Sequence, residues 1–293
     1  LGHRQLNYPI IIGHEGIGII DKIGDGVSHR TLGERVAIEP NIPCQRCNYC
    51  LSGRGNICIK KRVPGVNEPG CFAEYICLPE AFCWQLPVEI SDDDAVTIEP
   101  MAVAYHSLFS SHAKVGDTIA IIGLGAIGLL LSHLALSLGY KVLVTELNVN
   151  KLKMATDWGA IPAVVSGGSK DQLLQLSRLW LDHDVSAIFE CAGSAFTASL
   201  ATGAAPRGSD IVWVGLSAED ATFMPLKIAR EGINIVPSII YDHPFDYRRV
   251  IQLIKAGVIR PGLIISNNMA LDEIQSAIQL ASEGNESKIV IHM

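Results

Sequence analysis

The chain has 293 residues, of which 48% are hydrophobic and 18% charged, so it is too apolar for a disordered protein and suggests about two domains. Thirty acidic residues against 23 basic ones give a net charge of −7, which argues against a nucleic-acid partner. No stretch has the basic cluster of a membrane anchor, and no charged-then-apolar leader precedes the first motif. We therefore expect a cytoplasmic protein with no nucleic-acid or membrane partner.

Two short segments carry side chains that suit a metal. Residues 10–12 form an apolar, strand-like run, and the glycine-flanked loop that follows holds His14 and Glu15. Glu99 lies in an otherwise apolar stretch, directly before Pro100. Imidazole and carboxylate are both zinc ligands, and a metal can supply the counter-charge that a buried carboxylate needs. Taken singly, a loop histidine is more often not a ligand, and Glu99 could simply cap a helix.

Half of the eight cysteines form a compact motif with the spacing C-x2-C-x2-C-x7-C, made of Cys44, Cys47, Cys50 and Cys58. This spacing lets one loop fold around a tetrahedral ion, so it predicts a structural zinc site. The alternatives are a disulfide pair, which is disfavoured in a cytosolic protein, and a redox C-x-x-C, which does not need four cysteines. We expect the other four to be buried as small hydrophobic groups; they are Cys71, Cys77, Cys83 and Cys191.

Residues 118–145 have the order strand, glycine turn, helix, strand. The strand-like runs are 118–122 and 141–145, and helical spacing covers 126–138. Residues 118–138 contain no charged residue and are long enough to cross a membrane, but three glycines crowd their first half, which favours a nucleotide-binding loop. A glycine turn that only packs is the other alternative.

The glycine turn suits a dinucleotide. Gly123 permits a tight turn, Gly125 lets the backbone approach a pyrophosphate, and Gly128 permits close packing of helix and strand. The helix start offers free N–H groups to phosphates. Glu146, which ends the second strand, can accept from both ribose hydroxyls and would repel a 2′-phosphate, and the next residues, Leu147 and Asn148, are not basic. The sequence therefore favours NAD over NADP.

The remainder of the chain continues an alternating pattern. Further strand-like runs occur at 162–165, 185–190, 210–215 and 234–240. This alternation predicts an α/β fold with a doubly wound parallel sheet. Amphipathic helices are predicted at 247–256 and 271–282, with a final strand at 288–291.

Taken together, the motifs resemble the zinc-dependent medium-chain alcohol dehydrogenase superfamily over essentially the whole chain. The matching segments are Gly13-His14-Glu15-Gly16, Gly33-Glu34-Arg35-Val36, the four-cysteine lobe, Gly70-Cys71-Phe72-Ala73-Glu74-Tyr75, Glu99-Pro100, Gly123-x-Gly-x-x-Gly128 and Phe189-Glu190-Cys191-Ala192-Gly193. Glu99-Pro100 looks like the polyol and threonine dehydrogenase branch. Residues 97–103 look closest to sorbitol and other polyol dehydrogenases, whereas residues 64–70 look more like threonine 3-dehydrogenase.

The resemblance implies a Rossmann nucleotide domain at 101–240 and a GroES-like, mainly β catalytic domain at 1–100 that is completed by 241–293. It makes His14 a catalytic zinc ligand, Glu15 a direct or alternating ligand, and Glu99 a ligand or the holder of the water on the zinc. It also implies a set of cofactor contacts, with Lys151 on the adenosine ribose, Gly215 and Leu216 beside the nicotinamide, and Lys288 on the pyrophosphate. The full set is Gly123, Gly125, Ala126, Ile127, Gly128, Glu146, Lys151, Ala192, Gly215, Leu216 and Lys288.

One departure concerns the first ligand. The family has a cysteine ligand, with an adjacent Ser or Thr proton relay, before the Gly-His-Glu motif, and no cysteine occurs among the thirteen residues that precede His14. We expect a lost leading segment, because every downstream motif is intact; the alternative is a degenerate member.

The expected activity is reversible oxidation of a secondary alcohol of the polyol type, in which zinc polarises the hydroxyl group and hydride passes to NAD. The alternative within the same chemistry is L-threonine 3-dehydrogenase. An alternative of another class is a non-catalytic nucleotide-binding member. Relatives commonly form dimers or tetramers, so a homodimer or homotetramer is expected.

Overall fold

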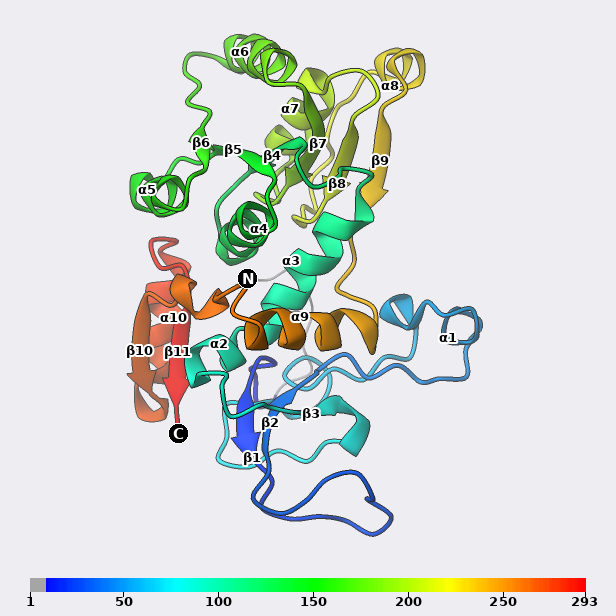
Figure 1. The fold of residues 1–293 in the computed structure, drawn as a ribbon, viewed down its shortest axis with the longest axis vertical. Helices are drawn as coiled ribbons and strands as arrows, with labels where there is room; N and C mark the ends of the chain where they lie inside the picture. The colour runs from blue at the N-terminus through cyan, green and yellow to red at the C-terminus, as the bar shows by residue number, and fades with distance from the viewer. Residues whose placement is uncertain (1–8) are drawn as a thin grey trace. The chain divides into compact units, whose positions relative to one another are not determined.

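The computed structural model describes residues 9–293, which fall into two compact units. Unit 1 combines the described residues up to Ala102 with Asp242–Met293, and unit 2 is Val103–Tyr241. The chain passes into unit 2 within helix α3, Ile98–Ser110, so the first crossing has no linker. Figure 1 labels the elements of both units.

Unit 2 is built on a six-stranded parallel sheet with the order β6-β5-β4-β7-β8-β9. Its strands are β4 Thr118–Ile122, β5 Lys141–Thr145, β6 Ile161–Pro162, β7 Val185–Glu190, β8 Asp210–Trp213 and β9 Asn234–Pro237. Its helices after α3 are α4 Ala126–Ser137, α5 Val149–Asp157, α6 Ser169–Asp182, α7 Ala195–Ala204 and α8 Pro225–Glu231.

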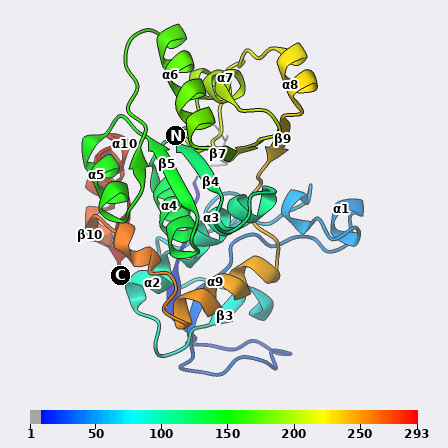
Figure 2. The same ribbon diagram turned by 45° about the horizontal axis from the view of Figure 1, so that its top comes forward.

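The sheet is doubly wound, as predicted. Figures 1 and 2 show α4 and α5 on one face of the sheet and α6 and α7 on the other. All five residues of β4 are buried, which is why the sequence shows them as an unbroken apolar run. Trp180 of α6 has no exposed surface and packs in a core with alternate residues of the sheet.

The apolar stretch 118–138 is not a single span. It is divided into β4, a glycine turn and the 12-residue helix α4. Among residues 9–293 no helix has the length and apolar character needed to cross a bilayer.

Unit 1 is mainly built from short strands and loops. An antiparallel sheet has the order β1-β2-β3, and β10 pairs in parallel with β11. The strands are β1 Ile17–Ile19, β2 Arg35–Ile38, β3 Cys83–Gln85, β10 Asn267–Ala270 and β11 Ile289–His292. The α-helices are α1 Asn48–Leu51, α2 Asp92–Val96, α9 Phe245–Lys255 and α10 Ile274–Ser282, and the 3-10 turns are η1 Gly55–Ile57, η2 Glu80–Phe82, η3 Pro261–Ile264 and η4 Leu271–Glu273.

A buried polar cluster joins the two chain segments of unit 1. Glu39, which follows β2, is fully buried and accepts a 2.7 Å hydrogen bond from Trp84 Nε1. His243 Nδ1 lies 2.8 Å from the same carboxylate, and the Tyr247 hydroxyl donates to the carbonyl of Ile38. The residues from 242 onward are therefore fastened to β2 and β3 by polar groups as well as by packing.

Two expectations about unit 1 are wrong. The strand predicted for residues 10–12 does not form; Ile11 and Ile12 instead accept hydrogen bonds from Gly70 and Phe72 in an irregular pairing. Cys77 is exposed rather than buried, because it lies in a loop outside the regular elements, while Cys71, Cys83 and Cys191 are half-buried.

Unit 2 holds a buried carboxylate at the amino end of β8. Asp210 accepts hydrogen bonds from the backbone N–H of His112 at 2.6 Å and from Asn234 Nδ2 at 2.8 Å, and His112 Nδ1 lies 2.9 Å away. Burial alone would raise the pKa of Asp210, but these hydrogen bonds outweigh it and leave the pKa below its ordinary value of 3.8.

We predict that Asp210→Asn lowers the free energy of unfolding by roughly 1–3 kcal/mol near pH 7, because charge-assisted hydrogen bonds are lost. A depressed pKa stabilises the fold above the unfolded value of about 3.9, and that contribution is lost as the pH falls through the folded value. Urea titrations of both proteins should therefore show a gap that is full at neutral pH and shrinks below about pH 4. A gap that does not change with pH would contradict this role.

Candidate active site and zinc centres

Unit 1 brings the three predicted ligands of the catalytic zinc together. One ligand atom each of His14, Glu15 and Glu99 lies within 4.8 Å of the others. Ligand atoms on a tetrahedral zinc ion with bonds of about 2.1 Å lie about 3.4 Å apart, so side-chain movements of roughly 1 Å would bring these atoms onto one ion. The set of one imidazole and two carboxylates therefore fits a zinc ion.

The loop that carries His14 and Glu15 is held by backbone packing among three glycines. A Cβ atom on either Gly65 or Gly70 would collide with the carbonyl oxygen of Gly13. Gly13 has a φ of +91°, and a Cβ there would lie 3.0 Å from the ring of Phe72. The N–H of Cys71 donates to Gly13 O at 2.8 Å. Segments 10–16 and 63–72 thus meet backbone to backbone, and this contact fixes the backbone position that carries the His14 side chain.

Glu99 reaches the cluster from a different element. It lies in the first turn of α3, preceded by Ile98, which has no exposed surface, and is itself only 6% exposed. The preceding helix α2 is capped by Ser91, whose hydroxyl accepts from the N–H of Asp94 at 3.2 Å. A capped short helix and a buried helix start therefore hold this carboxylate in place.

Lys288, predicted to contact a pyrophosphate, forms an ion pair with Glu15. Burial lowers the pKa of Lys288 to about 8. This contact joins the two ends of the chain, and nothing in the sequence spacing indicates it. The carboxylate of Glu15, expected to bind a metal, is therefore paired with Lys288 in this structure.

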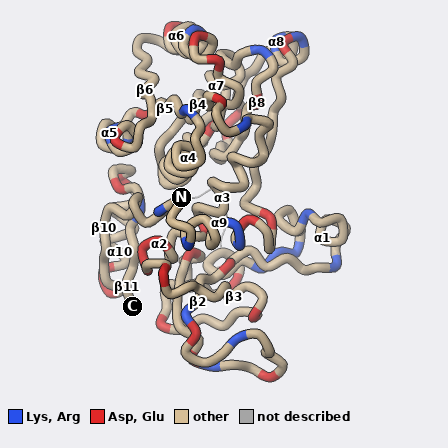
Figure 3. Tube along the Cα trace, in the orientation of Figure 1, with Lys and Arg blue, Asp and Glu red and all other residues tan. Residues whose placement is uncertain are grey.

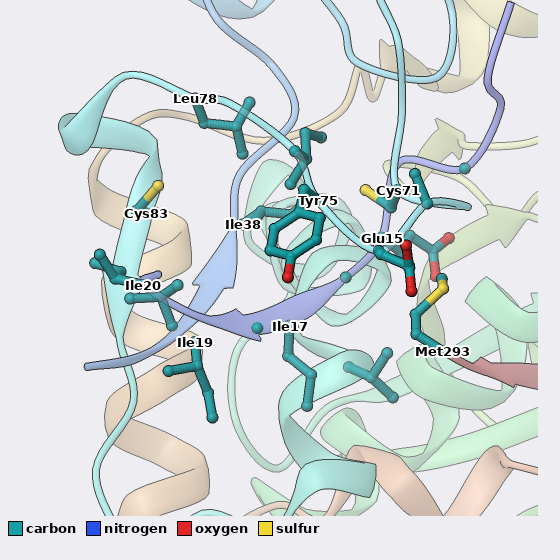
Figure 4. Close-up of a pocket in the computed structure, with 18 of the residues that line it drawn as sticks. Glu15, Ile17, Ile19, Ile20, Ile38, Cys71, Tyr75, Leu78, Cys83 and Met293 are labelled. Atoms are coloured by element: carbon teal, nitrogen blue, oxygen red, sulfur yellow. The ribbon is translucent and has the colours of Figure 1, made fainter. Parts of the chain in front are cut away.

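A cavity of about 1280 Å³ adjoins the cluster within unit 1. Figure 4 shows Glu15 and Cys71 at one end and Ile20 and Cys83 at the other, with Tyr75 between them. Its volume exceeds the roughly 300–1,000 Å³ usual for a small ligand, and its lining combines aliphatic side chains with several charged ones. The end at Glu15 adjoins the candidate zinc ligands.

The four-cysteine motif forms a second cluster. The Sγ atom of Cys47 lies 3.4 Å from that of Cys50 and 3.9 Å from that of Cys58, and Cys44 Sγ lies 4.0 Å from Cys50 Sγ. Sulfur atoms on a tetrahedral zinc with bonds of about 2.3 Å lie about 3.8 Å apart, so the site fits the ion. The cysteines are free thiols rather than disulfides. A hydrogen bond from the backbone of Cys50 lowers the pKa of Cys47 to about 6, which favours the thiolate.

The charge around this lobe also suits zinc bound by four thiolates, which carries two negative charges. Residues 40–67 contain five basic residues and no acidic one, although the whole chain is acidic. Figure 3 shows basic positions along the segment around α1. The basic residues are Arg46, Arg54, Lys60, Lys61 and Arg62.

Unit 2 places the predicted nucleotide contacts at the carboxyl ends of its strands, where ligands of such sheets bind. Gly123 follows β4 with a φ of +90°, and a Cβ there would lie 2.7 Å from the backbone nitrogen of Ala192. A Cβ on Gly128 would collide with Gly123 O, whereas Gly125 faces open space. Ala126 and Ile127 begin α4, and Gly215 and the exposed Leu216 follow β8.

Glu146 lies at the end of β5 and closes the glycine turn. Its carboxylate accepts hydrogen bonds from the backbone N–H groups of Leu124 at 2.5 Å, Leu147 at 2.7 Å and Asn148 at 2.8 Å. Lys151 lies one turn into α5 and is 8% exposed. The acid thus lies beside the turn that the sequence assigns to the pyrophosphate.

Comparison with known proteins gives the family. The alcohol dehydrogenase GroES-like domain profile matches residues 2–88, and the zinc-binding dehydrogenase profile matches residues 126–256. An uncharacterized zinc-type alcohol dehydrogenase-like protein of Escherichia coli K12 is 30% identical, over 98% of this chain and 82% of its own length. The sorbitol dehydrogenase of Bacillus subtilis 168 is 29% identical, over 96% of this chain and 80% of its own.

Solved structures of similar fold support the same family. A Sinorhizobium meliloti 1021 protein assigned as a zinc-binding dehydrogenase and bound to NADP has a TM-score of 0.86 and 29% identity, covering 98% of this chain and 85% of that one. An Escherichia coli CFT073 protein described as a short chain alcohol dehydrogenase, in complex with NADH, has a TM-score of 0.89 and 26% identity, with the same coverage of 98% and 85%. The chain belongs to the zinc-dependent medium-chain alcohol dehydrogenase superfamily, with a GroES-like and a Rossmann-like domain.

We predict that Cys47→Ser removes one equivalent of zinc per chain and lowers the thermal unfolding midpoint, because a closed four-thiolate site stabilises its lobe. Metal analysis and thermal unfolding measure both effects. Cys77→Ser is the matched control, since Cys77 lies outside the lobe and is exposed. Equal zinc contents in the two variants would contradict the assignment.

We predict that Gly70→Ala destabilises the fold by roughly 1–3 kcal/mol, because the added methyl group collides with Gly13 and Gly65. The displaced His14 loop should also release the zinc that is not bound by cysteines. Gly18→Ala is the control, since a Cβ there meets no atom within 4 Å. Unchanged zinc retention in Gly70→Ala would show that this packing does not position the ligands.

Proposed function

We propose that this chain is an NAD-dependent, zinc-dependent dehydrogenase of a polyol or a related secondary alcohol. The observation that carries the proposal is the cluster of His14, Glu15 and Glu99, whose ligand atoms lie within 4.8 Å of one another. The similarity to a sorbitol dehydrogenase supports the polyol class. We assign catalysis to unit 1 and nucleotide binding to unit 2.

Zinc, when bound, supplies a Lewis acid that polarises a hydroxyl group, and NAD supplies the hydride acceptor. The chain's own residues do the rest. His14 and Glu99 would hold the ion from two different segments, and Glu99 is buried. Glu15, which pairs with Lys288, would be a direct or alternating ligand. These residues would orient the substrate oxygen.

The glycine turn and Glu146 select the nucleotide. The turn leaves backbone N–H groups at the start of α4 for the pyrophosphate, and Gly125 faces open space on that side. The Glu146 carboxylate, which accepts from backbone N–H groups in this structure, would also accept from the ribose hydroxyls and would repel a 2′-phosphate. One structural relative binds NADP and another NADH, so the preference for NAD rests on Glu146.

The substrate is tested by turnover with zinc-replete, full-length protein, which includes the leading segment expected to carry the cysteine ligand. Sorbitol and xylitol should be oxidised with NAD at a higher kcat/KM than L-threonine. Residues 64–67 and 69–70 resemble threonine 3-dehydrogenase, so L-threonine is the second candidate substrate. Activity on threonine alone would refute the polyol assignment, and nucleotide binding without any turnover would favour a non-catalytic member.

We further propose a cytoplasmic homodimer or homotetramer. The net charge of −7 supports the location, and the family resemblance supports the assembly. Light scattering of the purified protein tests the assembly, and a monomeric mass would refute it.

We predict that Glu146→Arg lowers the ratio of kcat/KM for NAD to that for NADP by about tenfold to a hundredfold, because repulsion of a 2′-phosphate is replaced by attraction. Glu146→Gln keeps an oxygen for the turn but removes the charge, so it should shift the ratio less. Steady-state kinetics with both nucleotides measures the effect. An unchanged ratio in both variants would exclude Glu146 as the ribose contact.

A further inference from the structure

Glu190 ends strand β7 with its side chain turned back on the chain that follows. It is 2% exposed. Its Oε1 atom accepts three hydrogen bonds, from Ala192 N at 3.0 Å, Gly193 N at 2.9 Å and Thr197 Oγ1 at 2.8 Å. One buried oxygen therefore holds the loop after β7 and the first turn of α7.

The loop that Glu190 holds is enclosed by two other loops of unit 2. On one side, a Cβ on Gly123 would lie 2.7 Å from Ala192 N. On the other, a Cβ on Gly193 would lie 3.0 Å from both backbone N and O of Leu216. A Cβ on Gly215 would lie 2.7 Å from the second carboxylate oxygen of Glu190. The loops after β4, β7 and β8 thus pack with no room for side chains, and Glu190 lies among them.

The backbone of Glu190 strengthens the same junction. Its carbonyl oxygen accepts from Val214 N at 3.0 Å and from Gly215 N at 2.8 Å. The N–H of Cys191 donates to Ile122 O at 2.8 Å. Main chain and side chain of one residue therefore set the relative position of the two loops, 191–193 and 214–216.

We propose that Glu190 is the positioning residue for the nicotinamide half of the cofactor, because its carboxylate fixes the backbone of Ala192, Gly193 and Gly215. This inference rests on the proposed function and on the family resemblance, which implies that Gly215 and Leu216 lie beside the nicotinamide and that Ala192 contacts the cofactor. The adenosine half is assigned to Glu146 and Lys151, which follow a different strand. Loss of the Glu190 carboxylate should therefore affect one half of the dinucleotide and spare the other.

A purely structural role makes a different prediction. If Glu190 only stabilised the sheet or the start of α7, its removal would weaken binding of the whole nucleotide. ADP-ribose separates the two roles, because it has the adenosine and both phosphates of NADH but no nicotinamide.

The test measures dissociation constants of NADH and ADP-ribose by calorimetry on the zinc-loaded, full chain. Glu190→Ala should raise the constant for NADH about tenfold or more, the order expected when several N–H groups lose their acceptor, and leave that for ADP-ribose unchanged. Glu190→Gln should restore most of the NADH affinity, since all three hydrogen bonds need only one oxygen.

Asp210→Asn is the matched control, because Asp210 is also a buried carboxylate with a backbone and side-chain donors, but it lies at the opposite end of the sheet. It should leave the ratio of the two constants unchanged. If Glu190→Ala does not fold, Thr197→Val and Thr197→Ser form a second pair, in which only the valine removes a donor to Glu190.

The outcomes separate the two proposals. Equal loss of NADH and ADP-ribose binding, or no loss of either, would overturn the role of Glu190. Unmodified protein that binds neither compound would refute the proposed nucleotide-binding function itself. A selective loss of NADH affinity that glutamine restores would support both.

Discussion

The candidate sites of both units depend on one steric constraint, the contact of backbone with backbone where no Cβ atom fits. In unit 1 the contact joins Gly13 to Gly65 and Gly70, and in unit 2 it joins Gly123 and Gly215 to the loop after β7. Such contacts leave little freedom in the position of a loop, because interiors pack densely and a methyl group cannot be accommodated without a shift. Rigid loops are what a metal ligand or a cofactor contact requires.

Three carboxylates stabilise the candidate sites near these loops; Glu99 and Glu190 are buried and Glu146 is half-buried. Glu99 faces a candidate ion, Glu146 closes the nucleotide turn, and Glu190 holds the loop between two strands. Glu146 and Glu190 both accept hydrogen bonds from backbone N–H groups, and such partners offset the cost of burying a carboxylate. The acidic composition of the chain therefore reflects internal chemistry as well as its surface.

Much of this could be predicted from the sequence, where the signal is local. The apolar run before Gly123 and the spacing of the cysteines each report a structure made by neighbouring residues. The contact of Lys288 with Glu15 could not be predicted, because it joins the two ends of the chain. The missing strand at residues 10–12 has the same cause, since its hydrogen bonds depend on the distant segment 70–72. The hydrogen bonds of Glu190 to the loop after β7 did leave a local signal in the sequence. An acid is followed there by small residues and by a Ser-x-x-Thr capping pattern.

The central claim is that this chain transfers hydride from a polyol carbon to NAD. The most direct measurement incubates zinc-replete, full-length protein with NAD and with sorbitol or xylitol that carries deuterium on its secondary carbinol carbons, followed by mass spectrometry of the nucleotide. The account predicts NADH that contains one deuterium atom from the substrate. Unlabelled NADH, or no NADH from either polyol, would contradict it.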